Sequence, residues 1–240
     1  MTRPNREPRI RLRSPGRIRL VGVLALATAA IVHADVQHNA VATTVHNLSI
    51  SGPGEVHSLT ETQICKFCHV PHSAVVPEAL WGHVLSKAEY KTPTLRRGRA
   101  DARVAPQPDG SSRLCLSCHD GTVALGDVAG EPRRIAMAHR ERLRPGDRGY
   151  LGTDLSGSHP ISFTVEEHPR DLESEGGDVG LRPLAAIRTD PDVRLDGTGK
   201  MQCTTCHDPH SDRFYKEGEV PRFWVKPTVD EVCRTCHVVR

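Results

Sequence analysis

Eight cysteines in a repeated spacing constrain this chain more than any other feature of its sequence. They form four C-x-x-C pairs: Cys65/Cys68, Cys115/Cys118, Cys203/Cys206 and Cys233/Cys236. A histidine follows every pair directly: His69, His119, His207 and His237. C-x-x-C-H is the attachment signature of c-type haem, in which two thiols add to the two vinyl groups of one porphyrin and the next imidazole binds the iron. We therefore expect four covalently attached haem c groups, with the cysteines binding porphyrin and these histidines binding iron.

Three other uses of paired cysteines were weighed against this interpretation. C-x-x-C units can form four-cysteine zinc ribbons, secreted cysteines often form disulfides, and C-x-x-C can be a redox dithiol. None of these requires a histidine after every second cysteine. Histidine occupies only 14 of the 240 positions, so chance does not explain four such placements.

The first 34 residues are typical of a secretory signal peptide. Seven arginines precede an apolar stretch at Leu20–Val32, which ends in the small-residue pattern Val32-His33-Ala34. The alternative, an uncleaved membrane anchor, is less favoured because the stretch is short for a span. Cleavage removes seven of the 32 basic and one of the 29 acidic residues, so the net charge changes from +3 to −3. We expect an exported protein, extracellular or at the cell surface and alternatively periplasmic, with no membrane span after cleavage and no nucleic-acid partner.

Four haems leave little chain around each porphyrin, and nine aromatic residues are few for a core of this size. The predicted fold is therefore a few short helices and extensive loop wrapped around a close-packed stack of four haems, with little regular secondary structure. Residues 35–126 hold haems 1 and 2, residues 127–150 form an exposed loop, and residues 151–240 hold haems 3 and 4, in one haem-cored unit overall. Each attachment motif is expected to begin a short helix, with capping boxes at Thr60–Gln63 and Thr228–Glu231.

The second axial ligand of each iron follows by elimination. After residue 34 the only methionines are Met137 and Met201, so at least two haems cannot have His/Met ligation. Nine histidines remain beside the four in the motifs, which favours bis-histidine ligation throughout: His38, His46, His57, His72, His83, His139, His159, His168 and His210. An internal repeat, C-H-x-P-H, contains two of them, His72 and His210. Each lies too close to its own motif histidine to cross that haem, so each is expected to bind a neighbouring one.

The sequence gives only weak reasons to choose among the remaining candidate iron ligands. His159 lies in a Ser-Gly-Ser-His-Pro turn that can present an imidazole. His46 precedes the first motif, with His38 and His57 on either side, and spacing alone prefers none of the three. His83 follows Trp81-Gly82 and is equally explained as a packing or surface residue.

Several segments together resemble the doubled-CXXCH multihaem c-type cytochromes. They are 114–124 (LCLSCHDGTVA), 152–162 (GTDLSGSHPIS) and the doubled C-H-x-P-H, while 46–54 (HNLSISGPG) fits the N-terminal pattern of the same group. Within that family the chain is most similar to the OmcE-type tetrahaem outer-surface, or nanowire, cytochromes. The resemblance extends from about residue 44 to residue 240 and is weaker over the 127–150 loop.

The resemblance implies distal iron ligands at His46, His72, His159 and His210. It also implies a homo-polymer, an extracellular filament with a continuous haem chain, in which one distal histidine comes from the adjacent subunit. His46, near the N-terminus of the mature chain, is the candidate for that role. A ligand given across a heterologous interface generates an open filament unless the rotation closes. His83 departs from the family pattern and is left unassigned.

These observations predict an electron-transfer protein with no catalytic residues. Its expected partners are further copies of itself and redox partner cytochromes or extracellular acceptors. The alternatives are a soluble periplasmic tetrahaem electron shuttle, a multihaem reductase of a small nitrogen or sulfur oxyanion, and a haem subunit docked to a membrane quinol oxidase. A reductase needs one iron with an open sixth position, and nothing in the sequence marks one.

Overall fold

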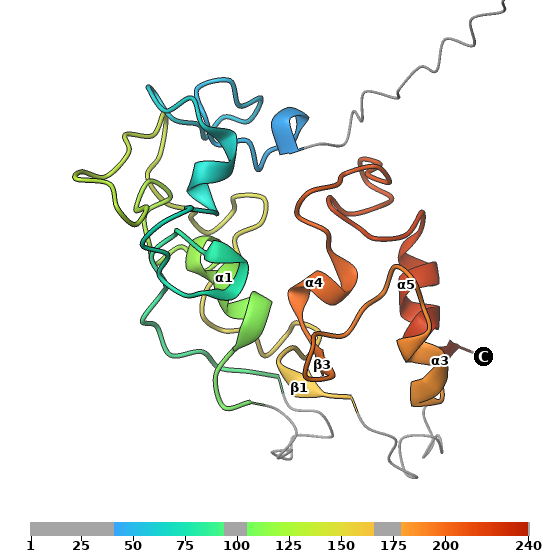
Figure 1. Cartoon of the computed structure of the whole chain (residues 1–240). Helices are drawn as coiled ribbons and strands as arrows, with labels where there is room; N and C mark the ends of the chain where they lie inside the picture. The colour runs from blue at the N-terminus through green and yellow to red at the C-terminus, as the bar shows by residue number, and fades with distance from the viewer. Residues whose placement is uncertain (1–40, 94–104, 166–178, 240) are drawn as a thin grey trace, which may run out of the picture. The chain divides into compact units, whose positions relative to one another are not determined.

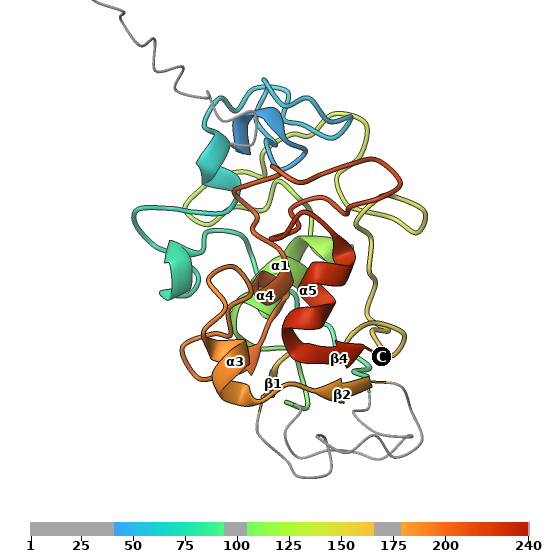
Figure 2. The same ribbon diagram turned by 90° about the vertical axis from the view of Figure 1, so that its right-hand side faces the viewer.

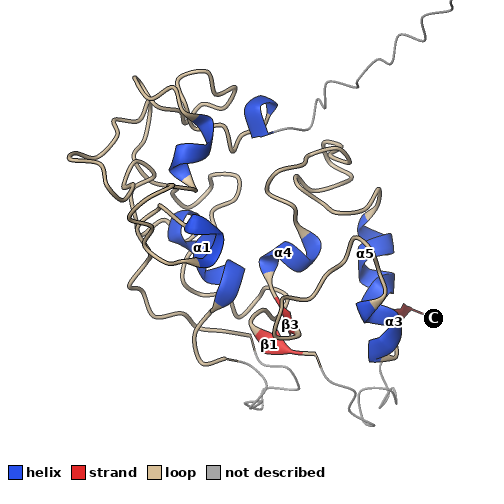
Figure 3. Cartoon of the chain, in the orientation of Figure 1, coloured by secondary structure: helices blue, strands red, loops and turns tan. Residues whose placement is uncertain are grey.

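Loops and turns make up most of the chain, with short helices and two small sheets among them (Figure 3). The computed structural model describes residues 41–93, 105–165 and 179–239. The predicted signal peptide, His38 and His168 lie outside the described residues. The prediction of few short helices and little regular secondary structure is confirmed.

Every attachment motif coincides with a short helix. The first lies at a 3₁₀ helix, Ile64–Phe67, and the others lie in α1 (Gly110–His119), α4 (Cys203–Cys206) and α5 (Val229–Cys236). Further helices are α3 (Leu184–Arg188) and two single 3₁₀ turns, Val41–Thr43 and Glu78–Leu80. The motif begins the helix only in α4. In α1 and α5 it ends the helix, contrary to the sequence expectation.

Of the two predicted capping boxes, one forms in half and the other does not form. The Thr228 hydroxyl accepts a hydrogen bond from the backbone N–H of Glu231 at the start of α5. The capping box at Thr60–Gln63 does not form. The first helix starts at Ile64, so Gln63 is itself the N-cap residue and makes no side-chain cap. A box that was not predicted joins Gln202 and Thr205 at the start of α4.

Two antiparallel pairs of strands join distant parts of the chain. Strand β1 (Phe163–Thr164) pairs with β3 (Lys200–Met201), with Phe163 opposite Met201. Strand β2 (Val179–Leu181) pairs with β4 (His237–Val239), with Leu181 opposite His237. The second pair therefore fixes the backbone of the fourth motif histidine. Among the described residues, no helix is long and apolar enough to span a membrane.

Apolar residues are buried in two separate clusters. The larger one packs α3 and α5 against β1 and β3, around Ile187, Val193, Met201, Val225 and Val232. The smaller one contains Phe67, Val70, Val128 and Ile135, with Met137 packed against it. Both methionines that follow residue 34 thus serve as packing residues.

The segment 127–150 contains no helix or strand, as predicted, but it is not exposed throughout. Val128 and Ile135 are only 6% and 8% exposed, because they pack in one cluster with Phe67 of the first motif. The prediction of an exposed loop is wrong for these residues. The segment is part of the core of the first haem motif rather than a free connection.

Hydrogen bonds join the second motif to the third across the long sequence gap between them. The Ser111 and Thr204 hydroxyls are 2.7 Å apart, and the backbone N–H of Cys203 donates to the Ser112 hydroxyl at 3.0 Å. Ser112 in turn donates to the Gln202 side-chain oxygen at 2.6 Å. Figures 1 and 2 show α1 and α4 beside each other accordingly. The sequence gap therefore does not separate two pairs of haem sites in space.

Candidate haem site

The eight cysteines are all free thiols, so none of the motif pairs forms a disulfide. In the part of the chain that the structure describes, no three histidine, cysteine or carboxylate side chains converge as a metal site. The cysteine pairs thus do not come together as a four-cysteine zinc ribbon there. Each pair instead remains next to its own histidine, as attachment to a porphyrin requires.

Burial raises the pKa of several of these thiols above its ordinary value. It raises the pKa of Cys68 and of Cys236 to about 11 and that of Cys206 to about 12. A redox dithiol instead has one cysteine whose pKa is lowered, so that its thiolate can attack a disulfide. A hydrogen bond from Cys115 lowers the pKa of Cys203 to about 7, but this contact joins two different motifs.

Thiols of successive motifs lie close to one another. Cys68 of the first motif interacts electrostatically with Cys118 of the second, and Cys115 of the second is hydrogen-bonded to Cys203 of the third. Cys206 of the third interacts with Cys236 of the fourth, and both pack in the larger apolar cluster. The attachment points therefore adjoin in the order of the sequence.

The motif histidines are oriented so that one ring nitrogen stays free. A backbone carbonyl lies within hydrogen-bond distance of Nδ1 in three of them: Ala79 for His69 (2.5 Å), Gly149 for His119 (2.7 Å) and Arg222 for His207 (3.1 Å). Such a bond fixes the ring and leaves Nε2 to bind metal. In His237, Nδ1 is buried without a hydrogen-bond partner. This donor set, beside paired free thiols, fits haem c.

Three motif histidines face a second histidine ring. The ring centres are 6.0 Å apart for His119 and His46, 6.0 Å for His69 and His210, and 6.3 Å for His237 and His159. Metal–nitrogen bonds of about 2 Å to imidazoles on opposite sides of one iron place the ring centres roughly 6 Å apart. The three pairs thus have the spacing of axial ligands. They include three of the four distal ligands that the family resemblance implies.

The distal rings are held by neighbouring polar groups. Nδ1 of His46 lies 3.3 Å from the Pro209 carbonyl, and Nδ1 of His159 lies 2.8 Å from the Pro160 carbonyl. His210 has a carboxylate instead, since its Nδ1 lies 3.3 Å from Oδ1 of Asp208. In all three rings Nε2 is the nitrogen left for a metal.

His207 and His72 have no histidine ring beside them in the described residues. The ring of His207 packs against Trp224, with centres 5.0 Å apart. The fourth expected distal ligand, His72, is exposed on the loop that follows the first motif. The structure therefore brings together six of the eight expected iron ligands and leaves these two apart.

The His46 ring lies against residues of its own chain. Its ring stacks on Phe223, with centres 4.1 Å apart and planes 8° apart, and its edge faces His119 of the same chain. Burial, with the His119 charge, lowers the pKa of His46 to about 4 and favours the neutral ring that metals bind. His46 itself is therefore held among Phe223, His119 and Pro209 of the same chain.

Three further histidines, His83, His57 and His139, do not face a motif histidine in the described residues. His83 is fully buried, and both ring nitrogens lie within hydrogen-bond distance of backbone carbonyls, those of Val84 and Ala124. It is a packing residue, one of the two interpretations left open by the sequence. His57 and His139, which belong to no motif, face one another with ring centres 6.4 Å apart.

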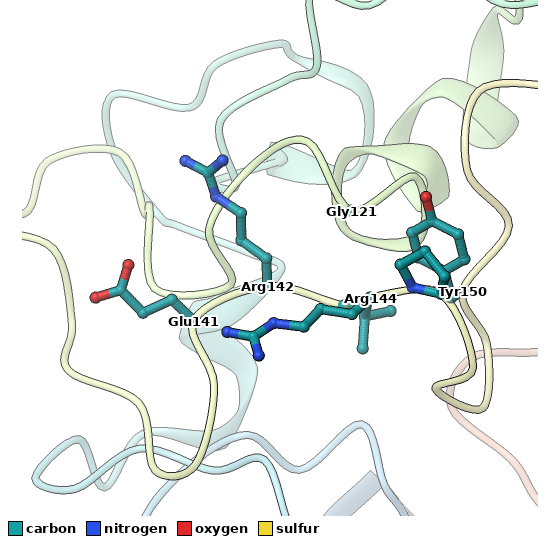
Figure 4. Close-up of a pocket in the computed structure, with 7 residues that line it drawn as sticks. Gly121, Glu141, Arg142, Arg144 and Tyr150 are labelled. Carbon is teal, nitrogen blue, oxygen red and sulfur yellow. The ribbon is translucent and has the colours of Figure 1, made fainter.

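A pocket lies beside the second motif, at the loop whose Gly149 carbonyl contacts the His119 ring (Figure 4). Its volume is about 410 Å³, and its lining includes Gly121, Arg142, Arg144 and Tyr150. Both guanidinium groups extend from the 141–145 strip of loop, while Tyr150 lies over Gly121. The Glu141 carboxylate also lines the pocket, so the lining carries charges of both signs.

Comparison with known proteins supports a multihaem c-type cytochrome. Residues 197–239, which contain the third and fourth motifs, match the family model of the doubled CXXCH motif. A search of curated proteins found no match. The CXXCH motifs indicate covalent binding of haem c.

Proposed function

We propose that this chain is a tetrahaem c-type cytochrome that transfers electrons through bis-histidine haems and performs no catalysis. The observation that carries the proposal is the set of three histidine ring pairs at 6.0 to 6.3 Å, each containing one motif histidine. Each bound haem supplies one-electron redox chemistry at its iron. The protein's part is to hold both axial positions, which keeps substrates away from the metal.

The attachment points give the array an order. Because thiols of successive motifs adjoin, we place the four haems in the sequence order 1–2–3–4. The hydrogen bonds between α1 and α4 hold the two inner sites together. This order describes a path with one end at the first motif and the other at the fourth.

We further propose the extracellular filament of the OmcE-type cytochromes, with His72 as the ligand given to a neighbouring subunit. Support comes from the mismatch between His207, which faces no histidine in the described residues, and His72, which is exposed and faces none. The repeat C-H-x-P-H makes His72 and His210 counterparts of each other. His210 follows the third motif and reaches the first, and His72 follows the first motif and is free to reach a third.

The proposal is tested on the secreted protein. Its intact mass should exceed that of the polypeptide by four haems, and cryo-electron microscopy should resolve filaments with His72 on the iron at His207 of the next subunit. His72→Ala should leave four haems attached but abolish filaments and make one haem per chain high-spin. A mass without added porphyrin would refute the cytochrome. Four haems in filaments formed by His72→Ala would refute the interface.

The His207 site also favours a second candidate, the oxyanion reductase. If no histidine reaches that iron, its sixth position is open to a small ligand. The matched measurement is nitrite or cyanide binding to the unmodified protein, monomeric and assembled. One high-spin haem that binds nitrite in both states would favour the reductase, whereas four low-spin haems in a monomer would favour the soluble shuttle.

A further inference from the structure

Phe223 adopts a backbone conformation that its side chain disfavours. Its φ is +62°, in the left-handed region that bulky residues rarely occupy, and the residue is only 7% exposed. Such strain persists only where surrounding contacts determine it, and it is concentrated at functional sites. The question is therefore what these contacts achieve.

A buried carboxylate holds this conformation. Oδ1 of Asp212, a residue that is 9% exposed, accepts the backbone N–H of Phe223 at 2.7 Å, while the other carboxylate oxygen is paired with the Arg222 guanidinium. The Phe223 carbonyl accepts the backbone N–H of Asp208 at 2.8 Å. Both sides of the strained peptide are thus tied to the loop that follows the third motif.

The strained backbone directs the aromatic ring onto His46. The two rings lie face to face at 4.1 Å with planes only 8° apart. Nδ1 of His46 also lies 3.3 Å from the Pro209 carbonyl. The His46 ring therefore has little freedom to rotate about the line that joins its centre to the centre of the His119 ring. The His46 plane is in this way set by residues more than 160 positions away in the sequence.

We infer that Phe223 is a positioning residue that fixes the plane of the His46 imidazole across the plane of His119. The inference rests on the proposed bis-histidine haems. The His46 and His119 rings are 71° apart, and the His159 and His237 rings are 69° apart, whereas those of His69 and His210 are only 16° apart. The chain therefore makes its haems inequivalent through the relative orientation of their ligands.

Ligand planes matter because each imidazole donates π density into the iron d orbital perpendicular to its ring. Parallel rings act on the same orbital and separate the two π orbitals of low-spin ferric iron, which gives a rhombic electron paramagnetic resonance spectrum. Crossed rings act on both orbitals and leave them nearly degenerate, which gives a single feature at large g. We expect one rhombic signal from the His69/His210 pair and two large-g signals from the other two pairs.

The test compares Phe223 variants of the secreted holoprotein by this resonance. Phe223→Leu removes the flat surface under His46, so one of the two large-g features should be lost or move toward the rhombic position. Phe223→Tyr keeps the flat surface and should retain it. Phe214→Leu is the matched control, since Phe214 packs under Arg213 and stacks on no histidine ring among the described residues. The haem content of every variant is measured separately.

Unchanged large-g features in Phe223→Leu, with four haems attached, would overturn the inference and leave the proposed cytochrome intact. Absence of haem from the unmodified protein would instead refute the proposed function. If Phe223→Leu does not fold, Asp212→Asn tests the same point, because it weakens the support of the strained backbone and retains the ring. The same feature should then shift, and an unaltered spectrum would overturn the inference.

Discussion

Replacing His210 by alanine tests the ligand assignment at the histidine pair whose members are furthest apart in the sequence. His210 follows the third motif, yet its ring lies 6.0 Å from that of His69 in the first motif, at 16°. The substitution touches neither a thiol nor a motif histidine, so four haems should remain attached. The ligand pairs at His119 and His237 do not involve His210 and should keep their spectra.

The expected magnitude follows from this count of ligands. One of the proposed four irons loses its sixth ligand, so the high-spin ferric fraction should rise by about a quarter of the total iron. Spin quantification by magnetic circular dichroism and the stoichiometry of cyanide binding both measure this fraction. The rhombic resonance assigned to the first haem should disappear in parallel.

His72→Ala in the monomer is the matched control, because His72 is the equivalent residue of the first repeat and faces no ring there. It should leave the monomer's spectrum unchanged. Retention of all low-spin haems in His210→Ala would refute the pairing with His69. Loss of a large-g signal in place of the rhombic one would show that His210 serves another haem.

Three further substitutions test the surroundings of the sites. Gly149→Ala should perturb the second haem's spectrum and lower the unfolding free energy more than its control, Gly146→Ala. Both residues have positive φ, where a side chain costs about 1–2 kcal/mol, but only at Gly149 would a Cβ lie 3.1 Å from the His119 ring. Ile187→Ala, at a residue 1% exposed in the larger cluster, should lower the unfolding free energy by about 2–5 kcal/mol, measured by guanidinium denaturation. Burial raises the pKa of Asp190, but a lysine and two backbone N–H groups outweigh this effect and lower the pKa to about 2. The stabilisation that ionised Asp190 contributes to the fold is therefore complete above about pH 4 and is lost as the pH falls toward 2. Asp190→Asn should reduce this pH dependence of stability in thermal melts.

The attachment residues were predictable because their spacing obeys covalent chemistry within five consecutive positions. The partners of the motif histidines were not, because they depend on loops whose course is set by distant contacts. The repeat indicated that His210 serves a neighbouring haem, but the sequence does not say which one. For His46 the informative residue is Phe223, and nothing in the spacing of either residue indicates that their rings stack.

The composition of segment 127–150 was misleading for a different physical reason. Arginine, proline and glycine are frequent there and favour an irregular, solvated chain, which is correct for the backbone. Burial, however, is decided by single side chains, and Ile135 enters the smaller cluster between two exposed neighbours, Arg134 and Ala136. A segment without a regular repeat gives no periodicity from which an inward-facing residue can be recognised.

The turn that follows the third motif connects three of the proposed haem sites. Its first residue, His207, belongs to the third site; the Pro209 carbonyl lies beside Nδ1 of His46, the distal ligand of the second; and His210 faces His69 of the first. The residues from 35 onward form one compact unit, and these contacts give a chemical reason for it. Because His210 of the half with the third and fourth motifs completes the ligand pair of His69, the first half alone lacks one of its proposed axial ligands.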